Sequence, residues 1–252
     1  MLAIEDRGLI FDASSQPPER RIAYFTSLCQ LASGDLLCGF QNGPSKHSPD
    51  SKIGLCRSRD GGRTWTELPA PFEHVLDGVP GSLSGAELVE ASPGKLLLFA
   101  TWFDRSDPAR PLFDPETEGI LKSKQLLAIS RDGGDSWGRW RELETGELRG
   151  TALTGPAVRF SDGQIAFAFE SFKEFDDPRP ARHGAWLLVT GDGGENFSPP
   201  LLLAQDPRHE VYYWDQRLCV GPSENEFVAL FWTHDLAQKR DLTVHLRCGK
   251  LV

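Results

Sequence analysis

The chain has 252 residues, of which 27 are Lys or Arg and 36 are Asp or Glu, so its formal net charge at pH 7 is −9. This length allows one large domain with a sizeable core, and the acidic balance argues against a nucleic-acid-binding surface. Met1 to Asp6 shows neither the basic n-region nor the apolar h-region of a signal peptide, and no apolar run approaches the length of a membrane span. We therefore expect a cytoplasmic protein with no membrane partner and no nucleic-acid partner.

The cysteine pattern points in the same direction. The chain has 5 cysteines, an odd number, and no Cys-x-x-Cys motif. Several of them lie in strand-like apolar runs. We expect buried free thiols in a reducing compartment.

Four β-hairpins are predicted along the chain, each consisting of two apolar segments joined by a tight turn. The turns fall at Gly34, Gly94, Gly163 and Asn225. They are about 60 to 70 residues apart, which indicates a repeated structural unit. Helix-forming stretches are scarce, and no linker divides the chain, so one all-β domain is expected.

A second repeat follows each of the first three hairpins and reads Ser/Thr-x-Asp-Gly-Gly-x-Thr/Ser/Asn-aromatic. Its copies run from Ser58 to Trp65, from Ser130 to Trp137 and from Thr190 to Phe197. Glycine tolerates the positive φ of a tight turn, and the Asp side chain bonds nearby backbone N–H groups. The terminal aromatic ring would then pack beneath the turn, where it buries a large area.

This repeat resembles the Asp-box, or BNR repeat, of the sialidase (neuraminidase) superfamily. In that family it joins the last two strands of propeller blades, away from the active site. The repeat therefore predicts the fold but not the catalytic activity. One unit here reads hairpin, third strand, Asp-box, fourth strand, which is a four-stranded propeller blade. The resemblance covers essentially the whole chain and implies a sialidase-type β-propeller.

The spacing of the repeats predicts how many blades this chain holds. A fourth Asp-box would fall near residues 251 to 263, and the segment from Leu242 to Arg247 has the pattern of a third strand. Sialidase propellers are six-bladed, so about four blades are expected here. We predict a single domain over residues 1–252 that is incomplete at its C-terminus; a smaller closed ring is the alternative.

The resemblance also implies a catalytic set. Family members use a Tyr nucleophile assisted by a Glu, and an Asp for general acid/base catalysis. Asp50 lies in the loop that matches the family Asp; an ordinary turn after Pro49 is the alternative. Tyr213 is the candidate for nucleophile or pocket wall. Glu87 is a pocket candidate because a charge on an inner strand is costly unless it faces a polar channel.

A sugar carboxylate would need guanidinium groups, which bind it in a bidentate manner. Arg21 lies two or three residues ahead of the position of the family Arg-Ile-Pro motif, and Arg217 follows a dense polar and aromatic cluster. The predicted substrate-binding residues are Arg21, His47, Arg105, Arg182, Asp215 and Arg217. Glu170 is assigned to the long loop of the third unit, where a solvated loop is the simpler interpretation.

These residues favour a sialidase-like glycoside hydrolase of the exo-α-sialidase type, acting on terminal sugars of glycans, whose activity is reduced or lost if parts of the catalytic set are missing. The alternative is a non-catalytic Asp-box propeller that binds glycan or protein at its channel mouth. The histidines are scattered without ligand spacing, so neither a metal nor another cofactor is expected. The expected partner is a carbohydrate ligand.

Overall fold

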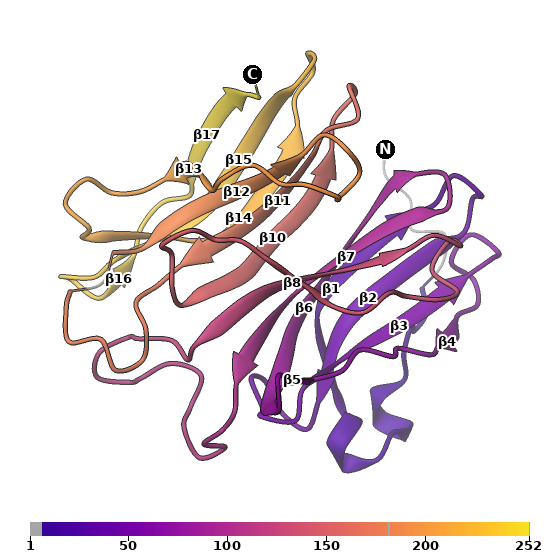
Figure 1. The fold of residues 1–252 in the computed structure, drawn as a ribbon, viewed down its shortest axis with the longest axis horizontal. Helices are drawn as coiled ribbons and strands as arrows, with labels where there is room; N and C mark the ends of the chain where they lie inside the picture. The colour runs from indigo at the N-terminus through magenta and orange to yellow at the C-terminus, as the bar shows by residue number, and fades with distance from the viewer. Residues whose placement is uncertain (1–6, 181, 252) are drawn as a thin grey trace.

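A computed structural model describes residues 7–180 and 182–251 of the chain. Its strands form four antiparallel sheets arranged around a common centre (Figure 1). The predicted all-β architecture is confirmed, with about four propeller blades in the chain. Two short 3-10 helices, Ala13–Ser15 and Pro18–Arg20, precede the first blade.

Each sheet is built from consecutive strands. The first has the order β1 (Ile22–Gln30), β2 (Leu36–Gly43), β3 (Lys52–Ser58) and β4 (Thr66–Leu68). The second is β5 (Val75–Leu76), β6 (Val79–Ser92), β7 (Lys95–Asp104), β8 (Ser123–Ser130) and β9 (Arg141–Leu143). The third is β10 (Thr151–Arg159), β11 (Ile165–Ser171), β12 (Gly184–Thr190) and β13 (Leu201–Ala204). In the fourth, β14 (Val211–Val220) pairs with β15 (Glu226–Asp235), which pairs with both β16 (Arg240–Asp241) and β17 (His245–Lys250).

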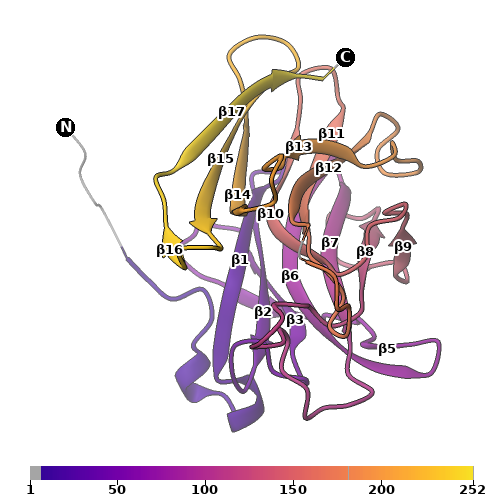
Figure 2. The same cartoon turned by 90° about the vertical axis from the view of Figure 1, so that its left-hand side faces the viewer.

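The first long strand of each sheet lies nearest the centre. These inner strands pack in chain order, β1 against β6, β6 against β10 and β10 against β14. They lie together at the centre of Figure 2 as well. All four inner strands are the first strands of the predicted hairpins, so the hairpin periodicity places the centre of the propeller.

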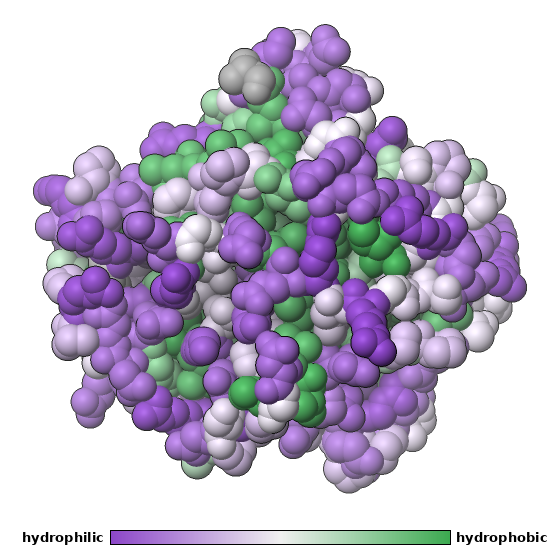
Figure 3. Space-filling model, viewed as in Figure 1, coloured by the Kyte–Doolittle hydropathy of each residue, from purple (hydrophilic) through white to green (hydrophobic). Residues whose placement is uncertain are grey.

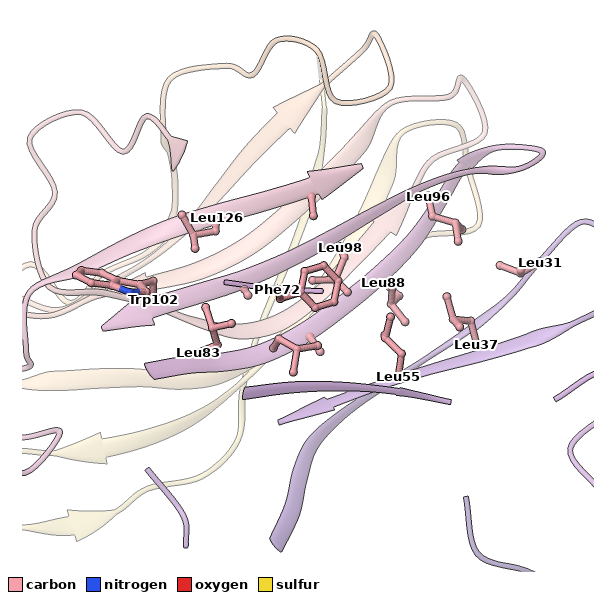
Figure 4. Packing of buried hydrophobic residues seen from close by; sticks show 14 residues of the cluster. Leu31, Leu37, Leu55, Phe72, Leu83, Leu88, Leu96, Leu98, Trp102 and Leu126 are labelled. Atoms are coloured by element: carbon pink, nitrogen blue, oxygen red, sulfur yellow. The ribbon is translucent and has the colours of Figure 1, made fainter. Parts of the chain in front are cut away.

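The hydrophobic core occupies the spaces between neighbouring sheets. Between the first two sheets, Leu37 and Leu55 meet Leu88, Leu96 and their neighbours, and all of them are buried (Figure 4). Equivalent clusters fill the second and third interfaces. Each fully buried leucine contributes roughly 1.5–3 kcal/mol relative to an exposed one, so these interfaces hold the blades together.

The Asp-box turns have the predicted structure. In the first copy, Asp60 accepts hydrogen bonds from the Ser58 hydroxyl at 2.8 Å, the Thr64 backbone N–H at 2.9 Å and the Thr64 hydroxyl at 2.7 Å. The Ser58 hydroxyl oxygen accepts from the Gly62 N–H at 2.8 Å. Trp65 packs beneath, against the cluster of Cys38, Phe40 and Cys56.

The second and third copies repeat these bonds, centred on Asp132 and Asp192. Arginines of the preceding blade hold both turns. The Arg57 guanidinium on β3 donates to Asp135 at 2.5 Å and to the Gly133 carbonyl. In the same way, Arg141 on β9 donates to the carbonyl oxygens of the third turn. The repeat therefore links neighbouring blades in addition to closing a hairpin.

The fourth sheet presents an apolar outer face. Leu230 and Trp232 on β15 and Leu246 on β17 are all more than 40% exposed. The remaining surface in the view of Figure 3 is mainly hydrophilic, with separate apolar patches among the charged side chains. Within residues 7–180 and 182–251, none of the helices has the length and apolar character needed to cross a membrane.

Candidate functional site

All four inner strands have an irregularity at a similar point along their length. The strand register shifts between Tyr24 and Ser27 in β1, between Ser84 and Glu87 in β6, between Leu153 and Ala157 in β10, and between Trp214 and Arg217 in β14. In three of them two residues oppose one residue of the neighbouring strand, which is the pattern of a β-bulge. Bulges redirect side chains and are frequent beside active sites.

Two of these bulges place non-glycine residues in the left-handed region. Phe25 has φ 51° and Asp215 has φ 48°, while Gly85 at the equivalent point of β6 has φ 72°. Such a backbone is unfavourable for a bulky residue such as Phe and persists where the surrounding structure enforces it. The left-handed backbone conformations therefore indicate that a functional site lies at the bulges of the inner strands.

A cavity of about 450 Å³ opens at the bulges. All four bulge regions contribute to its lining, through Phe25, Ser84, Thr154 and Asp215 among others. Its aromatic wall consists of Phe25, Phe103, Phe113, Phe172, Tyr212 and Trp214. The ionisable groups of its lining are Lys46, His47, Asp114, Glu118, Glu170, Tyr212 and Asp215.

Glu170, at the end of β11, forms part of the floor of this cavity and is only 1% exposed. Its carboxyl oxygen Oε1 accepts a hydrogen bond from the Thr154 hydroxyl at 2.6 Å and a longer one from the Gln216 N–H at 3.4 Å. Burial raises the pKa of Glu170 to about 8, and the nearby Asp215 carboxylate adds to the effect. The raised pKa favours the protonated form of Glu170 at neutral pH.

Close packing of the inner strands fixes the floor. A Cβ atom at Gly155 on β10 would lie 2.6 Å from the Gln216 carbonyl oxygen on β14. Gln216 is fully buried and donates through Nε2 to the Phe169 carbonyl at 2.7 Å. The Asp215–Gln216 bulge is thus held against the end of β11, where Glu170 lies.

His47 also lines the cavity. Burial lowers the pKa of His47 to about 4, and the charges of Lys46 and Arg105 act in the same direction. The imidazole is therefore neutral at physiological pH. Arg105 is buried beneath this loop and donates to the His47 carbonyl at 2.9 Å, to the Ser82 hydroxyl at 2.9 Å and to the Arg110 carbonyl at 3.2 Å. Its donors hold the loop in place.

Glu87 and Arg217 belong to the same central region. Burial raises the pKa of Glu87 to about 7, while a hydrogen bond from Ser27 and the charge of Arg217 oppose the shift. The Arg217 guanidinium donates to the carbonyl oxygens of Thr154 at 2.6 Å, Asp215 at 3.1 Å and Gln216 at 3.1 Å. Neither side chain is part of the cavity lining.

The other predicted site residues lie elsewhere. Tyr213 is 7% exposed and packs in the core against Phe231, at 5.4 Å between ring centres. Asp50 is exposed, and its carboxylate partly offsets the lowering of the Arg105 pKa by burial. Arg21 is exposed and donates to the Gln16 carbonyl at 3.2 Å. Arg182 lines a separate cavity of about 600 Å³. The structure thus brings His47 and Asp215 together in one cavity.

Sequence reasoning missed Glu170 because it was assigned to a loop. It is in fact the penultimate residue of β11, whose residues are all buried. A charge directly after the apolar run Ile165 to Phe169 was the available signal, since a buried strand tolerates a carboxyl group only with specific partners. Within residues 7–180 and 182–251, no three His, Cys, Asp or Glu side chains are grouped in a way that would hold a metal ion.

Comparison with known proteins finds similarity to a sialidase. No family model matches the chain. It is 25% identical over 158 residues to a sialidase from Bacteroides fragilis, a match that covers 58% of this chain and 28% of that protein. The chain thus spans less than a third of the length of this curated relative.

Solved structures match over more of the chain. A Hadza microbial sialidase superposes with a TM-score of 0.66 at 16% identity, covering 84% of this chain and 42% of that one. A Trypanosoma rangeli sialidase gives 0.60 at 12% identity, covering 84% and 34%. A Dyadobacter fermentans protein of unknown function gives 0.64 at 19% identity, covering 90% and 65%. These matches show that the fold is the sialidase-type propeller.

Proposed function

We propose that this chain, whose fold is that of the sialidase superfamily, is a glycoside hydrolase that removes a terminal sugar from a glycan. The observation that carries the proposal is the buried Glu170 carboxyl, whose pKa burial raises to about 8, beside Asp215 in an aromatic-walled cavity. A carboxyl group whose pKa is raised by burial, next to a second carboxyl group, is what acid-assisted cleavage of a glycosidic bond requires.

The roles follow from the environments of the two groups. Glu170 would donate its proton to the glycosidic oxygen as the bond between that oxygen and the anomeric carbon breaks. Asp215 would stabilise the positive charge on the sugar ring or accept a proton from the attacking water. Water supplies the hydroxyl group for the anomeric carbon, and its one released proton returns to Glu170, either directly or by way of Asp215. The aromatic wall would stack on the apolar face of the sugar.

Hydrolysis of α-sialosides is the specific form of this activity that the names of the relatives suggest. In that form, Asp50, Glu87 and Tyr213 would be the catalytic candidates, with Arg21 and Arg217 as ligands of the sugar carboxylate. A fluorogenic α-sialoside is therefore the first substrate to assay. Loss of turnover in Asp50→Ala, with Glu170→Gln still active, would favour this catalytic set over the one proposed here.

The central test is a pair of charge-removing variants. Glu170→Gln and Asp215→Asn are expected to reduce release of a fluorogenic leaving group by about 10²-fold or more, because general acid–base catalysis contributes on that order. Glu144→Gln, an exposed residue of the second blade, is the matched control and should retain full activity. Unchanged turnover in Glu170→Gln would contradict the proposed acid.

Non-catalytic glycan binding is the second candidate, and a specific observation favours it. The ring of Tyr213 is packed in the core, and the donors of Arg105 are used by the protein itself. A cavity with this lining would bind a sugar by stacking without needing to cleave it. Binding of glycans with no turnover of any glycoside by the unmodified protein would support this candidate over hydrolysis.

A further inference from the structure

We infer that the terminal sugar held in the central cavity carries no anionic group, so that a hexose or hexosamine is taken in preference to a sialic acid. The inference rests on the proposed function only in placing the terminal sugar in this cavity. It concerns the charge of the ligand and not its cleavage.

The lining of the cavity is acidic. At formal charge, the carboxylates of Asp114, Glu118 and Asp215 give −3 and the Lys46 ammonium gives +1, for a sum of −2. Glu170 adds no charge at neutral pH, because burial raises its pKa to about 8. His47 adds none either, because burial lowers its pKa to about 4. A ligand carboxylate would thus enter a cavity of its own sign.

The nearby guanidinium groups do not offset this charge from within the cavity. Neither Arg105 nor Arg217 belongs to the lining. Arg105 donates through Nε, Nη1 and Nη2 to protein oxygens. Arg217 directs Nη1 to three backbone carbonyl oxygens. Bidentate binding of a sugar carboxylate by Arg105 would require its contacts to be given up, and Arg217 lies outside the cavity lining.

The cations of this region collect in a different place. Arg149, Lys173, Arg179, Arg182 and Arg208 line the neighbouring cavity of about 600 Å³, where they outnumber the carboxylates of Glu147, Glu174 and Asp177. Phe172 lines both cavities. The acidic character is therefore a property of the central cavity itself.

The remaining lining suits a sugar with hydroxyl groups only. Aromatic rings such as Trp214 and Phe172 offer surfaces for the C–H face of a hexose. The exposed carboxylate of Glu118 and the Thr154 side chain can bond its hydroxyl groups. An ammonium group of a hexosamine would be attracted by the same carboxylates and by the aromatic faces.

The test measures binding rather than turnover. Methyl glycosides of galactose, glucosamine and sialic acid are titrated into Glu170→Gln and into the unmodified protein, with dissociation constants taken from ligand-observed NMR. The galactoside or the glucosaminide is expected to bind at least 10-fold more tightly than the sialoside. Raising the salt concentration should narrow the difference, because screening weakens the repulsion.

Removing one lining charge provides the decisive variant. Glu118→Gln should bring the sialoside affinity closer to that of the galactoside, whereas the control Glu144→Gln should leave the ratio unchanged. Equal or tighter binding of the sialoside by the unmodified protein would overturn the inference, as would failure of all three glycosides to bind. If the preference is found but no glycoside is cleaved, the hydrolase proposal fails and the inference stands.

Discussion

Thr154 donates its hydroxyl proton to the Glu170 carboxyl at 2.6 Å, across neighbouring strands of the third blade. This bond favours the ionised carboxylate, so it works against the burial that raises the Glu170 pKa. Thr154→Val removes the hydroxyl with little change in shape. We expect the alkaline limb of the pH–activity profile to move to higher pH in this variant. A limb that stays in place would show that another group sets it.

Glu170 also predicts how stability depends on pH. Its pKa rises from 4.5 in the unfolded chain to about 8 in the fold, so between these values the folded state holds a proton that the unfolded state has lost. Stability should therefore fall as the pH rises through this window, by about 1.4 kcal/mol per pH unit from this group. Chemical denaturation at several pH values measures the slope.

The Glu170→Gln variant separates the contribution of Glu170 to the pH dependence of stability from that of Glu87. It should lose the Glu170 part of the slope and be more stable than the unmodified protein above pH 8. The Glu87 pKa, raised to about 7, has the same sign and leaves a residual slope that ends near that pH. An unchanged slope in Glu170→Gln would rule out a proton on this buried carboxyl.

The inner strands are sensitive to a single methyl group. Gly155→Ala would place a Cβ 2.6 Å from the Gln216 carbonyl, which must move away from β10. We expect a loss of about 1–3 kcal/mol in unfolding free energy together with weaker ligand binding, because the Asp215 bulge shifts with Gln216. Gly191→Ala, where no atom lies within 4 Å, is the control and should be near neutral.

The Asp-box turns allow a test that uses their own repetition. Ser130 is buried, donates to Asp132 at 2.7 Å and accepts from the Gly134 N–H at 2.8 Å. Ser130→Ala should cost about 1–3 kcal/mol, because the buried Gly134 donor is left without its partner. Ser130→Thr should be tolerated, since Thr190 makes the same bonds in the third copy. Thermal or denaturant unfolding measures the stability of both variants.

The fold could be predicted because its signals are local. Each Asp-box is closed by bonds among residues no more than four positions apart, so the motif carries its structure wherever it occurs. The hairpins have similarly short turns. Counting both repeats was enough to predict four-stranded blades and their approximate number. The expected third strand of the last blade, Leu242 to Arg247, is observed slightly later, as His245–Lys250.

The site was less predictable because it depends on strand faces and on contacts between blades. Tyr212 and Tyr213 are neighbours on β14, yet the first lines the cavity and the second lies in the core. Alternation requires opposite faces for the two residues, but the sequence does not say which face is central. The bulge at Asp215 then changes the alternation for Arg217. Glu170 acquires its raised pKa mainly from burial and to a smaller extent from Asp215 of the next blade, which no local pattern encodes.

The bulges of the inner strands have one further consequence. They are features of the backbone, and the residues that they turn toward the cavity, such as Phe25, Thr154 and Asp215, are outside the clusters that hold the blades together or only border them. A new side chain at one of these positions would alter the ligand without loosening the scaffold. Single replacements at these positions can therefore change which ligand is bound while the packing that stabilises the fold is kept. Related propellers can diverge in substrate in this way.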